Sequence, residues 1–389
     1  MHVQVFAPIF PYPCHEGAFI TIAEQVKRLR ELGYRVHLFY WKGADPSPQV
    51  LDAVFPGIEV TRLGSDRNEP ATAARIAKSL FSKWSSAELF HYPPHLGGEL
   101  DRLPTADLRI FHYSFSGPWL SRKRLSGKTA VVFHNLETEL YRQRAIAEPR
   151  GPARWIHALN AKKLREHERR LSDGCDELWF LSPKDMSDFA RSARPSVPLR
   201  VFPPFFSRAF LEARRKPRKK AARPVIGFVG GLHFRPNQVS AEWIVDQVAP
   251  ELSKRGFAGR LLIVGKGPSS RLLEKAKAFP FVEVTGFLAD LDPYWSDVSL
   301  SLSPHLEGSG VRMKLLESLA AGVPVLTHRM ALEQLIEPLK HHPQLFATDS
   351  PAEWAEIIMK APALPEPMTE GDRALTEPPA WFTSQGSAT

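Results

Sequence analysis

A glycine-rich loop followed by two charged side chains is the part of the sequence best suited to chemistry. The loop, Gly308-Ser309-Gly310, precedes a stretch of helical periodicity. Such a loop gathers free backbone N–H groups at the positive end of a helix dipole, which suits a phosphate group. Lys314 and Glu317 lie opposite the apolar stripe of the predicted helix. Their spacing of three therefore points both side chains into one cleft beside the loop.

Two interpretations of this pair stay open. A Lys–Glu pair on a surface helix is often only a solvated ion pair. The order Lys314 then Glu317 is the less favourable one for such a pair. A basic and an acidic group beside an anion-binding loop also suit a nucleotide sugar, with Lys for the diphosphate and Glu for the ribose hydroxyls.

These residues need a scaffold, and the sequence predicts two doubly wound α/β domains. Short apolar runs alternate with longer amphipathic segments, a pattern typical of parallel sheets covered by helices on both faces. The predicted strands of the first domain are 3–7, 36–40, 58–63, 108–112, 129–134, 177–181 and 199–202. Those of the second are 225–229, 260–264, 281–285, 298–302 and 323–327. Two such domains are expected to bind ligands in a cleft at the carboxyl ends of their strands.

The predicted boundaries follow composition. Residues 1–207 form the first domain, and 208–223 form a linker that contains the basic run Arg214–Lys220. Residues 224–360 form the second domain, and the proline-rich segment 361–389 is a strap or tail. The basic run predicts a solvated hinge, with contact to anionic lipid headgroups as the alternative.

Composition narrows the class of partner. Lys and Arg number 51 against 42 Asp and Glu, a net charge of +9, which predicts an anionic partner. No recognition helix or aromatic platform accompanies the basic residues, so nucleic acid is not expected. Two cysteines cannot build a disulfide framework, and no apolar run has the length of a signal peptide or membrane span. The expected location is the cytoplasm, with peripheral attachment to the inner face of the plasma membrane open.

The chain resembles glycosyltransferase family 4, retaining enzymes with the GT-B fold of two facing Rossmann-like domains. The segment 304–326 is similar to the donor-binding signature of that family. The motifs 228–232 with 235–237, 263–268, and 284–287 are similar to the first three strand ends of the family's donor domain. The resemblance covers residues 1 to about 360.

The resemblance implies a set of donor-binding residues and three catalytic ones. Lys314 and Glu317 are expected to act on the donor, with His134 facing the reacting centre at the end of a strand. The expected donor-binding residues are Gly17, Gly230, Gly231, Arg235, Asn237, Gly265, Phe287, Glu307, Gly308, Ser309, Gly310 and Arg312. On the acceptor side the candidates are His112 and Asn135.

The chain departs from the family pattern at two places. The first of two glutamates separated by seven residues is replaced by Ser309, and Glu307 lies nearby. The usual basic pair after the first strand of the donor domain is replaced by Gly231 and Pro236, which leaves Arg235, Arg312 and Lys314 for the diphosphate.

The resulting prediction is a metal-independent hexosyl- or related transferase without a cofactor. Its substrates would be a UDP- or GDP-linked sugar and a lipid-linked or saccharide acceptor, in cell-surface or extracellular polysaccharide or glycolipid assembly. The Asp290-x-Asp292 sequence lies in a loop and is not assigned to a metal. The alternatives are a non-catalytic sugar-nucleotide-binding protein of the same fold and, more remotely, a basic nucleic-acid-binding protein.

Overall fold

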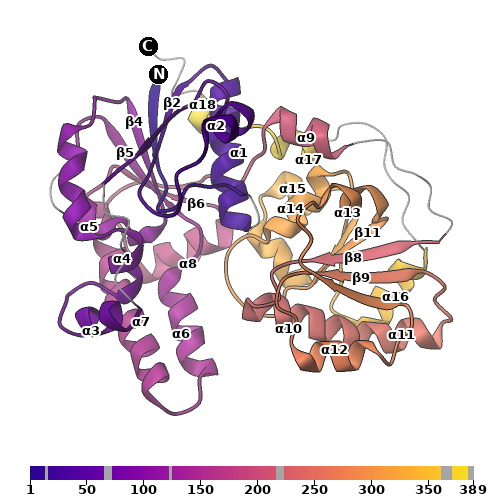
Figure 1. Cartoon of the computed structure of the whole chain (residues 1–389). Coiled ribbons are helices and arrows are strands. Elements are labelled where there is room, and N and C mark those ends of the chain that lie inside the picture. The colour runs from indigo at the N-terminus through magenta and orange to yellow at the C-terminus, as the bar shows by residue number, and fades with distance from the viewer. Residues whose placement is uncertain (14–15, 65–71, 122–124, 216–222, 361–369, 384–389) are drawn as a thin grey trace. The chain divides into compact units, whose positions relative to one another are not determined.

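The computed structural model describes residues 1–13, 16–64, 72–121, 125–215, 223–360 and 370–383. The chain divides into two compact units, each with its own parallel sheet (Figure 1). The first unit consists of Met1–Pro204, Ser309–Val311 and Pro378–Thr389. The second consists of Phe205–Gly308 and Arg312–Glu377.

The first unit is built on a seven-stranded parallel sheet with the order β3-β2-β1-β4-β5-β6-β7. Its strands β4, β5 and β6 are almost entirely buried, because helices cover both faces of the sheet. The strands are β1 (His2–Phe6), β2 (Arg35–Tyr40), β3 (Glu59–Arg62), β4 (Leu108–His112), β5 (Lys128–Phe133), β6 (Glu177–Phe180) and β7 (Leu199–Val201).

The helices of the first unit begin and end where the local sequence dictates. Helix α1 ends before Gly33, which takes a φ of 88° and donates its N–H to the carbonyl of Arg30. The α-helices are α1 (Gly17–Glu31), α2 (Pro48–Val54), α3 (Thr72–Leu80), α4 (Ser86–His91), α5 (Gly117–Leu120), α6 (Glu137–Ala147), α7 (Pro152–Arg170), α8 (Pro183–Ala193) and α18 (Ala380–Thr383). Short 3-10 helices are η1 (Pro94–Arg102), η2 (Ser114–Ser116) and η3 (Leu171–Asp173).

The second unit is built on a six-stranded parallel sheet with the order β10-β9-β8-β11-β12-β13. Its strands are β8 (Val225–Val229), β9 (Arg260–Val264), β10 (Val282–Gly286), β11 (Leu300–Ser303), β12 (Val325–Thr327) and β13 (Leu345–Ala347). The α-helices are α9 (Arg208–Arg214), α10 (Arg235–Trp243), α11 (Ala249–Lys254), α12 (Ser270–Ala276), α13 (Asp292–Asp297), α14 (Met313–Ala320), α15 (Glu337–Lys340), α16 (Pro351–Lys360) and α17 (Glu370–Ala374). A π-helical turn, η4 (Ile244–Val248), joins α10 to α11, and η5 (Arg329–Gln334) is a 3-10 helix.

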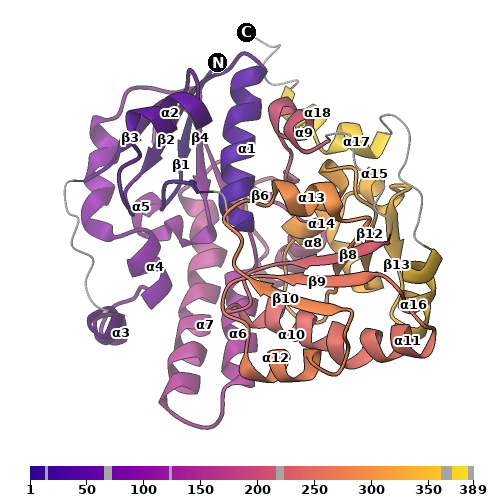
Figure 2. The same cartoon turned by 45° about the vertical axis from the view of Figure 1, so that its right-hand side comes forward.

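Each face of the second sheet has its own core. Figure 2 shows α10, α11 and α12 below the strands and α13, α14 and α15 above them. The lower core packs Ile226, Phe228 and Trp354 together, and the upper core packs Tyr294, Trp295 and Val323. The apolar patterning therefore predicts the sheet and its two covering layers, because both faces of every central strand must be buried.

The predicted strands agree with the observed ones to within about two residues, with one omission. The predicted strand 298–302 is observed as β11 (Leu300–Ser303), and 323–327 as β12 (Val325–Thr327). The edge strand β13 (Leu345–Ala347) was not predicted. Its three residues are too few to show a strand period, and its pairing with β12 depends on the assembled sheet.

The structure differs from the predicted linker 208–223. Its first half is helix α9, capped by the Ser207 side chain and anchored by buried Leu211. Arg214 Nη1 lies 2.7 Å from Asp292 Oδ1 and Arg215 pairs with Asp372, so these two basic residues face carboxylates of the second unit. The remainder of the basic run, residues 216–220, lies outside the described residues.

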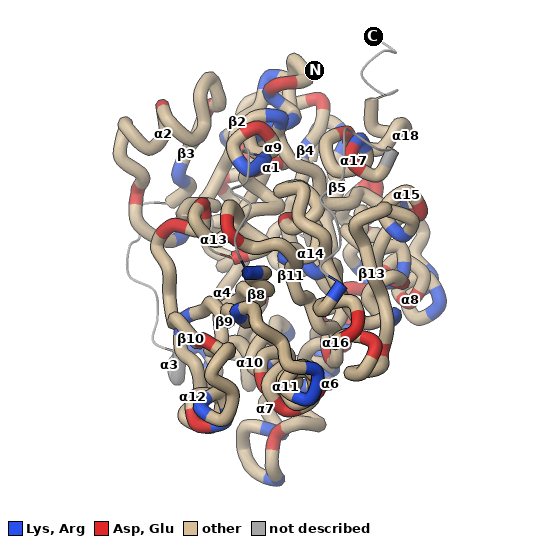
Figure 3. Tube along the Cα trace, turned by 90° about the vertical axis from the view of Figure 1, so that its right-hand side faces the viewer, with Lys and Arg blue, Asp and Glu red and all other residues tan. Residues whose placement is uncertain are grey.

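Acidic and basic positions are interspersed over the second unit (Figure 3). Helices α11 and α12 carry both signs, as in the pair between Lys254 and Glu251, 2.6 Å apart.

The predicted strap 361–389 contains helices α17 and α18, and α18 packs onto the first unit. There Trp381 donates its indole N–H to the Val201 carbonyl at 3.2 Å, and Phe382 is buried.

Candidate functional site

In the second unit the predicted donor-binding residues gather where the strand order reverses. This point lies between β8 and β11, whose connections leave the sheet in opposite directions. Open α/β sheets bind ligands outside the carboxyl ends of strands at such a point. Gly230 and Gly231 follow the end of β8, and β11 leads into the loop before α14.

The amine of Lys314 lies directly against the end of β8. Its Nζ donates to Asn237 Oδ1 at 2.7 Å and lies 4.2 Å from the centroid of the Phe228 ring. A Cβ placed on Gly230 would come within 2.7 Å of the same Nζ, so the chain needs glycine there for the lysine to approach. Burial, reinforced by the neighbouring Arg312 charge, lowers the pKa of Lys314 to about 7.

Glu317 lies one turn further along α14 and is buried, with 8% of its surface exposed. Its carboxylate opposes the lowering of the Lys314 pKa, so the two side chains interact electrostatically. The observed pair is therefore not the solvated surface pair of the alternative interpretation. A buried cation and anion side by side can bind a ligand that offers both a phosphate and hydroxyl groups.

A second group of predicted residues surrounds the loop before α14. Arg235 Nε lies 3.2 Å from Glu307 Oε1, and Arg312 donates to the Glu307 carbonyl. Gly308 has a φ of 97°, in the left-handed region that favours glycine. His305, which was not predicted, is buried and its Nε2 lies 3.3 Å from the Gly308 carbonyl oxygen. These contacts hold the loop before any ligand binds.

Two further predicted residues have different surroundings. Phe287 follows β10 and is 53% exposed, so its ring could contact a flat ligand. Gly265 follows β9, and a Cβ there would lie only 1.9 Å from the Gly230 carbonyl oxygen. The structure thus gives Gly265 a packing reason, the close approach of two strand ends.

Replacing Gly265 tests this packing directly. We expect Gly265→Ala to lower the stability of the second unit by about 2–4 kcal/mol, because the obstacle is backbone and cannot rotate away. Gly151→Ala is the matched control, since no atom lies within 4 Å of a Cβ there. Thermal unfolding followed by calorimetry measures both, and equal midpoints for the two variants would contradict the packing explanation.

In the first unit two predicted histidines meet at the strand ends. His112 ends β4 and His134 follows β5, and His112 Nδ1 lies 2.9 Å from His134 Nε2. Burial lowers the pKa of His134 to about 3, and burial followed by the His134 charge lowers that of His112. Both rings are therefore neutral at physiological pH, and one ring donates to the other.

Tyr113 supports this pair and was not predicted. Its ring stacks on His134 with centroids 4.3 Å apart, and its φ of 74° is rare for a residue with a side chain. Such backbone strain persists only where the surrounding structure holds it, often at functional sites. No local sequence signal marks a tyrosine in this conformation.

A group of buried carboxyls adjoins the histidines. Burial, followed by the charge of Glu168, raises the pKa of Glu137 to about 8, and burial raises that of Glu168 to about 7. Glu168 accepts from Ser114 Oγ at 3.0 Å and from Thr138 Oγ1 at 2.6 Å. The sequence did not predict this group, because its members come from separate elements.

The segment Ser309–Val311 belongs to the first unit by its contacts. The Gly310 N–H donates to Asp185, and a Cβ on Gly310 would lie 2.3 Å from Asn135 Oδ1. Burial raises the pKa of Asp185 to about 7. The amide of Gly310 was expected to face a phosphate, and here it is bonded to a carboxyl. Ser309 Oγ is buried and makes no hydrogen bond to the described residues.

Gly17, the last of the predicted donor-binding residues, begins α1, after β1. Its carbonyl accepts from Thr21 Oγ1 at 2.8 Å. Within the described ranges, no three His, Cys, Asp or Glu side chains are grouped to hold a metal. Among the same residues, no helix has the length and apolar character needed to cross a membrane.

Comparisons with known proteins agree with this geometry. Residues 223–361 match the family model described as Glycosyl transferases group 1. The chain is similar to the solved structure of sucrose-phosphate synthase from Thermosynechococcus elongatus, with 17% identity, a TM-score of 0.61, and coverage of 92% of this chain and 89% of that one. A comparison with curated proteins gave no significant match.

Two further solved structures share the architecture. Trehalose-6-phosphate synthase OtsA has 14% identity and a TM-score of 0.63, with 96% of this chain and 93% of that chain covered. Anabaena Alr3699/HepE in complex with UDP and glucose has 13% identity and a TM-score of 0.57, with 92% and 89% covered.

The fold is thus the GT-B fold of glycosyltransferases, with two Rossmann-like domains, as the resemblance implied. Within the second domain, residues 223–361 are similar to the Glycosyl transferases group 1 family. These findings support a nucleotide-sugar-dependent glycosyltransferase.

Proposed function

We propose that this chain is a retaining glycosyltransferase that moves a sugar from a nucleoside-diphosphate sugar to an acceptor hydroxyl. The observation that carries the proposal is the Lys314 amine, held against Gly230 and Asn237 at the reversal point of the second sheet. The site lies inside the matched segment 223–361. An amine that burial keeps partly neutral gains most from a dianionic partner.

The proposed donor roles follow from the contacts. Lys314 would stabilise the departing diphosphate, because its charge is fixed close to the loop and needs little rearrangement. Arg312 and Arg235 would add positive charge, with Arg235 released from its exposed pair with Glu307 at small cost. Glu317 would accept hydrogen bonds from the ribose hydroxyls. Phe287, which is half exposed, would cover the base.

The first unit would supply the acceptor side. His134 and His112 form a neutral pair that can donate to or accept from a sugar hydroxyl without adding charge. We propose a UDP- or GDP-linked hexose or related sugar as donor and a saccharide or lipid-linked acceptor in cell-surface or extracellular glycan assembly. The Alr3699/HepE structure holds UDP and glucose, which supports UDP. The reaction would need no metal or cofactor, and the expected location is the cytoplasm or the inner membrane face.

A screen of nucleotide sugars by thermal shift tests the proposal, because a bound donor stabilises the folded chain by mass action. The best donor is then incubated with the chain, and NMR shows whether sugar is released or transferred and with which anomeric configuration. Glu317→Gln should weaken donor binding about 10- to 100-fold through loss of a charged acceptor. The control Glu274→Gln removes an exposed carboxylate from the same unit and should bind normally.

One observation favours a second candidate, a non-catalytic sugar-nucleotide-binding protein. Ser309 occupies the position where family 4 has its first glutamate, and the serine belongs to the first unit by its contacts. Donor binding without transfer or hydrolysis would support this candidate. Retention of configuration in a transferred product would establish the enzyme, and inversion would contradict the retaining mechanism.

A further inference from the structure

We propose a second ligand site in the first unit, a pocket for a phosphorylated monosaccharide on the C-terminal turn of α7. This site is independent of the proposed donor site, which lies in the second unit. The pocket has a volume of about 320 Å³, at the small end of the ~300–1,000 Å³ range of ligand pockets. It suits one sugar ring with its phosphate better than a whole nucleotide sugar.

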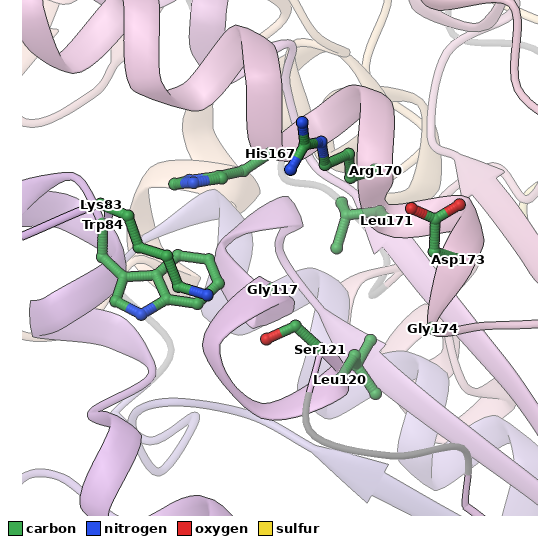
Figure 4. Close-up of a pocket in the computed structure, with 10 residues that line it drawn as sticks. All are labelled: Lys83, Trp84, Gly117, Leu120, Ser121, His167, Arg170, Leu171, Asp173 and Gly174. Carbon is green, nitrogen blue, oxygen red and sulfur yellow. The ribbon is translucent and has the colours of Figure 1, made fainter.

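The lining combines cations, an aromatic face and hydroxyl partners (Figure 4). Lys83 and Arg170 supply cationic groups and His167 supplies a ring nitrogen, and Figure 4 shows the Arg170 side chain extending toward His167. Trp84 supplies a flat ring at 4.5 Å from the His167 ring, centroid to centroid. The remaining polar groups of the lining are Ser121 and Asp173, and Figure 4 shows Asp173 on the far side from Trp84.

A buried carboxylate orients His167. Glu88 has no exposed surface and its Oε2 accepts from His167 Nδ1 at 2.8 Å. The other ring nitrogen, Nε2, is thereby left for a ligand. The second carboxylate oxygen, Oε1, makes no hydrogen bond within the described structure and lies 3.5 Å from where a Cβ of Gly117 would be. Glu88 therefore fixes the orientation of the His167 ring from behind the pocket wall.

The cations are available to an anion. Lys83 Nζ lies 4.7 Å from the Trp84 ring centroid, a contact that keeps the amine beside the aromatic face. Arg170 Nη2 pairs with Glu166 Oε1 at 2.6 Å, but the Arg170 side chain is 70% exposed. An exposed pair of this kind is worth only ~0–1 kcal/mol, so a phosphate can displace it.

The combination decides the class of ligand. Arg, Lys and His side chains can each donate hydrogen bonds to phosphate oxygens. The broad apolar ring of Trp84 can pack against the C–H face of a pyranose. Asp173 can accept hydrogen bonds from sugar hydroxyls, and Ser121 can donate or accept. Inorganic phosphate alone would leave Trp84 and Asp173 unused.

Close packing maintains the shape of the pocket. A Cβ on Gly117 would lie 3.3 Å from Trp84 Cζ3, and one on Gly174 would lie 2.6 Å from the Leu120 carbonyl oxygen. Both glycines line the pocket. The absence of a side chain therefore lets Gly117 approach Trp84 and lets Gly174 approach Leu120.

Isothermal titration of the full chain tests the proposal with mannose 6-phosphate, mannose and inorganic phosphate as probes. We expect saturable binding of mannose 6-phosphate and at least tenfold weaker binding of the other two. Lys83→Gln and Arg170→Gln should each weaken mannose 6-phosphate binding about tenfold or more, the loss of one charge-assisted hydrogen bond. Neither should change the unfolding midpoint, because both side chains are largely exposed.

Two controls separate this pocket from other sources of affinity. Arg165→Gln removes an exposed charge from the same helix, and it should leave binding within about twofold. Lys314→Met alters the proposed donor site and should also leave binding unchanged. Equal losses in Arg165→Gln and Arg170→Gln, loss in Lys314→Met, or equal affinity for mannose would each overturn the proposal, as would the absence of saturable binding.

Discussion

Lys314→Met should reduce binding of the donor's nucleoside diphosphate by at least ~100-fold and lower sugar transfer further. Methionine keeps the length of the side chain but removes the charge held 2.7 Å from Asn237 Oδ1. Truncating a desolvated charged partner costs ~2–5 kcal/mol, and losing one donor to developing charge costs ~10²–10³ in rate. Calorimetry with the diphosphate and steady-state transfer kinetics measure the two effects.

The pH dependence of diphosphate binding shows whether Lys314 contacts the diphosphate. The pKa of Lys314 is about 7 in the free protein because of burial, and a bound dianion raises it. Below pH 7 the amine is already protonated, so affinity is constant there. Above pH 7 binding must take up a proton, so affinity should fall by up to about tenfold per pH unit. Lys314→Met should abolish this slope.

Lys254→Met is the matched control for Lys314→Met. Lys254→Met removes a lysine whose side chain is 69% exposed in the same unit and pairs with Glu251. It should bind the diphosphate normally and keep the wild-type pH slope. Equal binding by Lys314→Met and wild type would exclude Lys314 from the donor site, whatever its effect on turnover.

The sequence predicts the second unit well because its functional residues follow consecutive strand ends. Gly230, Gly265 and Phe287 come after β8, β9 and β10, and parallel strands place their carboxyl ends at one edge. The spacing of Lys314 and Glu317 also places both side chains on the same face of one helix. The location of these residues can therefore be predicted from local sequence patterns.

The sequence could not predict contacts that depend on tertiary packing. Gly265 was interpreted as a donor contact, whereas the close Gly230 carbonyl explains why it is glycine. The pocket joins α7 to the loop before α4, and its residues Trp84 and Arg170 are 86 positions apart in the sequence. Neither element has a motif of its own, and only the fold brings their side chains together.

The same limit applies to the buried carboxyls of the first unit. In the sequence, Glu137 follows a strand and Glu168 lies in a strongly basic stretch of α7, and neither position carries a motif. The structure turns Glu168 inward, where it accepts from the Glu137 N–H at 3.1 Å. Burial then raises both pKa values, and the charge of Glu168 adds to the rise at Glu137, which no sequence pattern reveals.

These carboxyls should make the first unit less stable as the pH rises from 6.5 to 8. The unfolded pKa of Glu137 is near 4.5, and burial raises the folded value to about 8. Between these values the folded chain holds a proton that the unfolded chain has released, so stability falls with pH. One such proton costs about 2 kcal/mol over 1.5 pH units. That lowers the unfolding midpoint by about 4–8 °C for a unit of this size.

The buried histidines define the lower end of this window. His91 and His134 have pKa values lowered to about 3 by burial, whereas the unfolded value is near 6.5. Below pH 6.5 the histidines of the unfolded chain bind protons, whereas those of the folded chain stay neutral. The free energy of unfolding therefore falls with acidification. The carboxyl effect is therefore isolated above pH 6.5, and stability should be greatest near that pH.

Glu137→Gln tests the assignment within this window, because glutamine is a neutral replacement of nearly the same shape. The variant should lose the share of the decline in unfolding midpoint between pH 6.5 and 8 that belongs to Glu137, whereas Glu168 and Asp185 keep theirs. Glu139→Gln on the same helix is the matched control: Glu139 pairs with Arg142 at 2.7 Å, and this hydrogen bond lowers its pKa. The control should keep the wild-type slope above pH 6.5, since Glu139 is already ionised there in both states. Parallel slopes for Glu137→Gln and wild type would show that Glu137 is ionised in the folded chain throughout, and would refute a proton held there by burial.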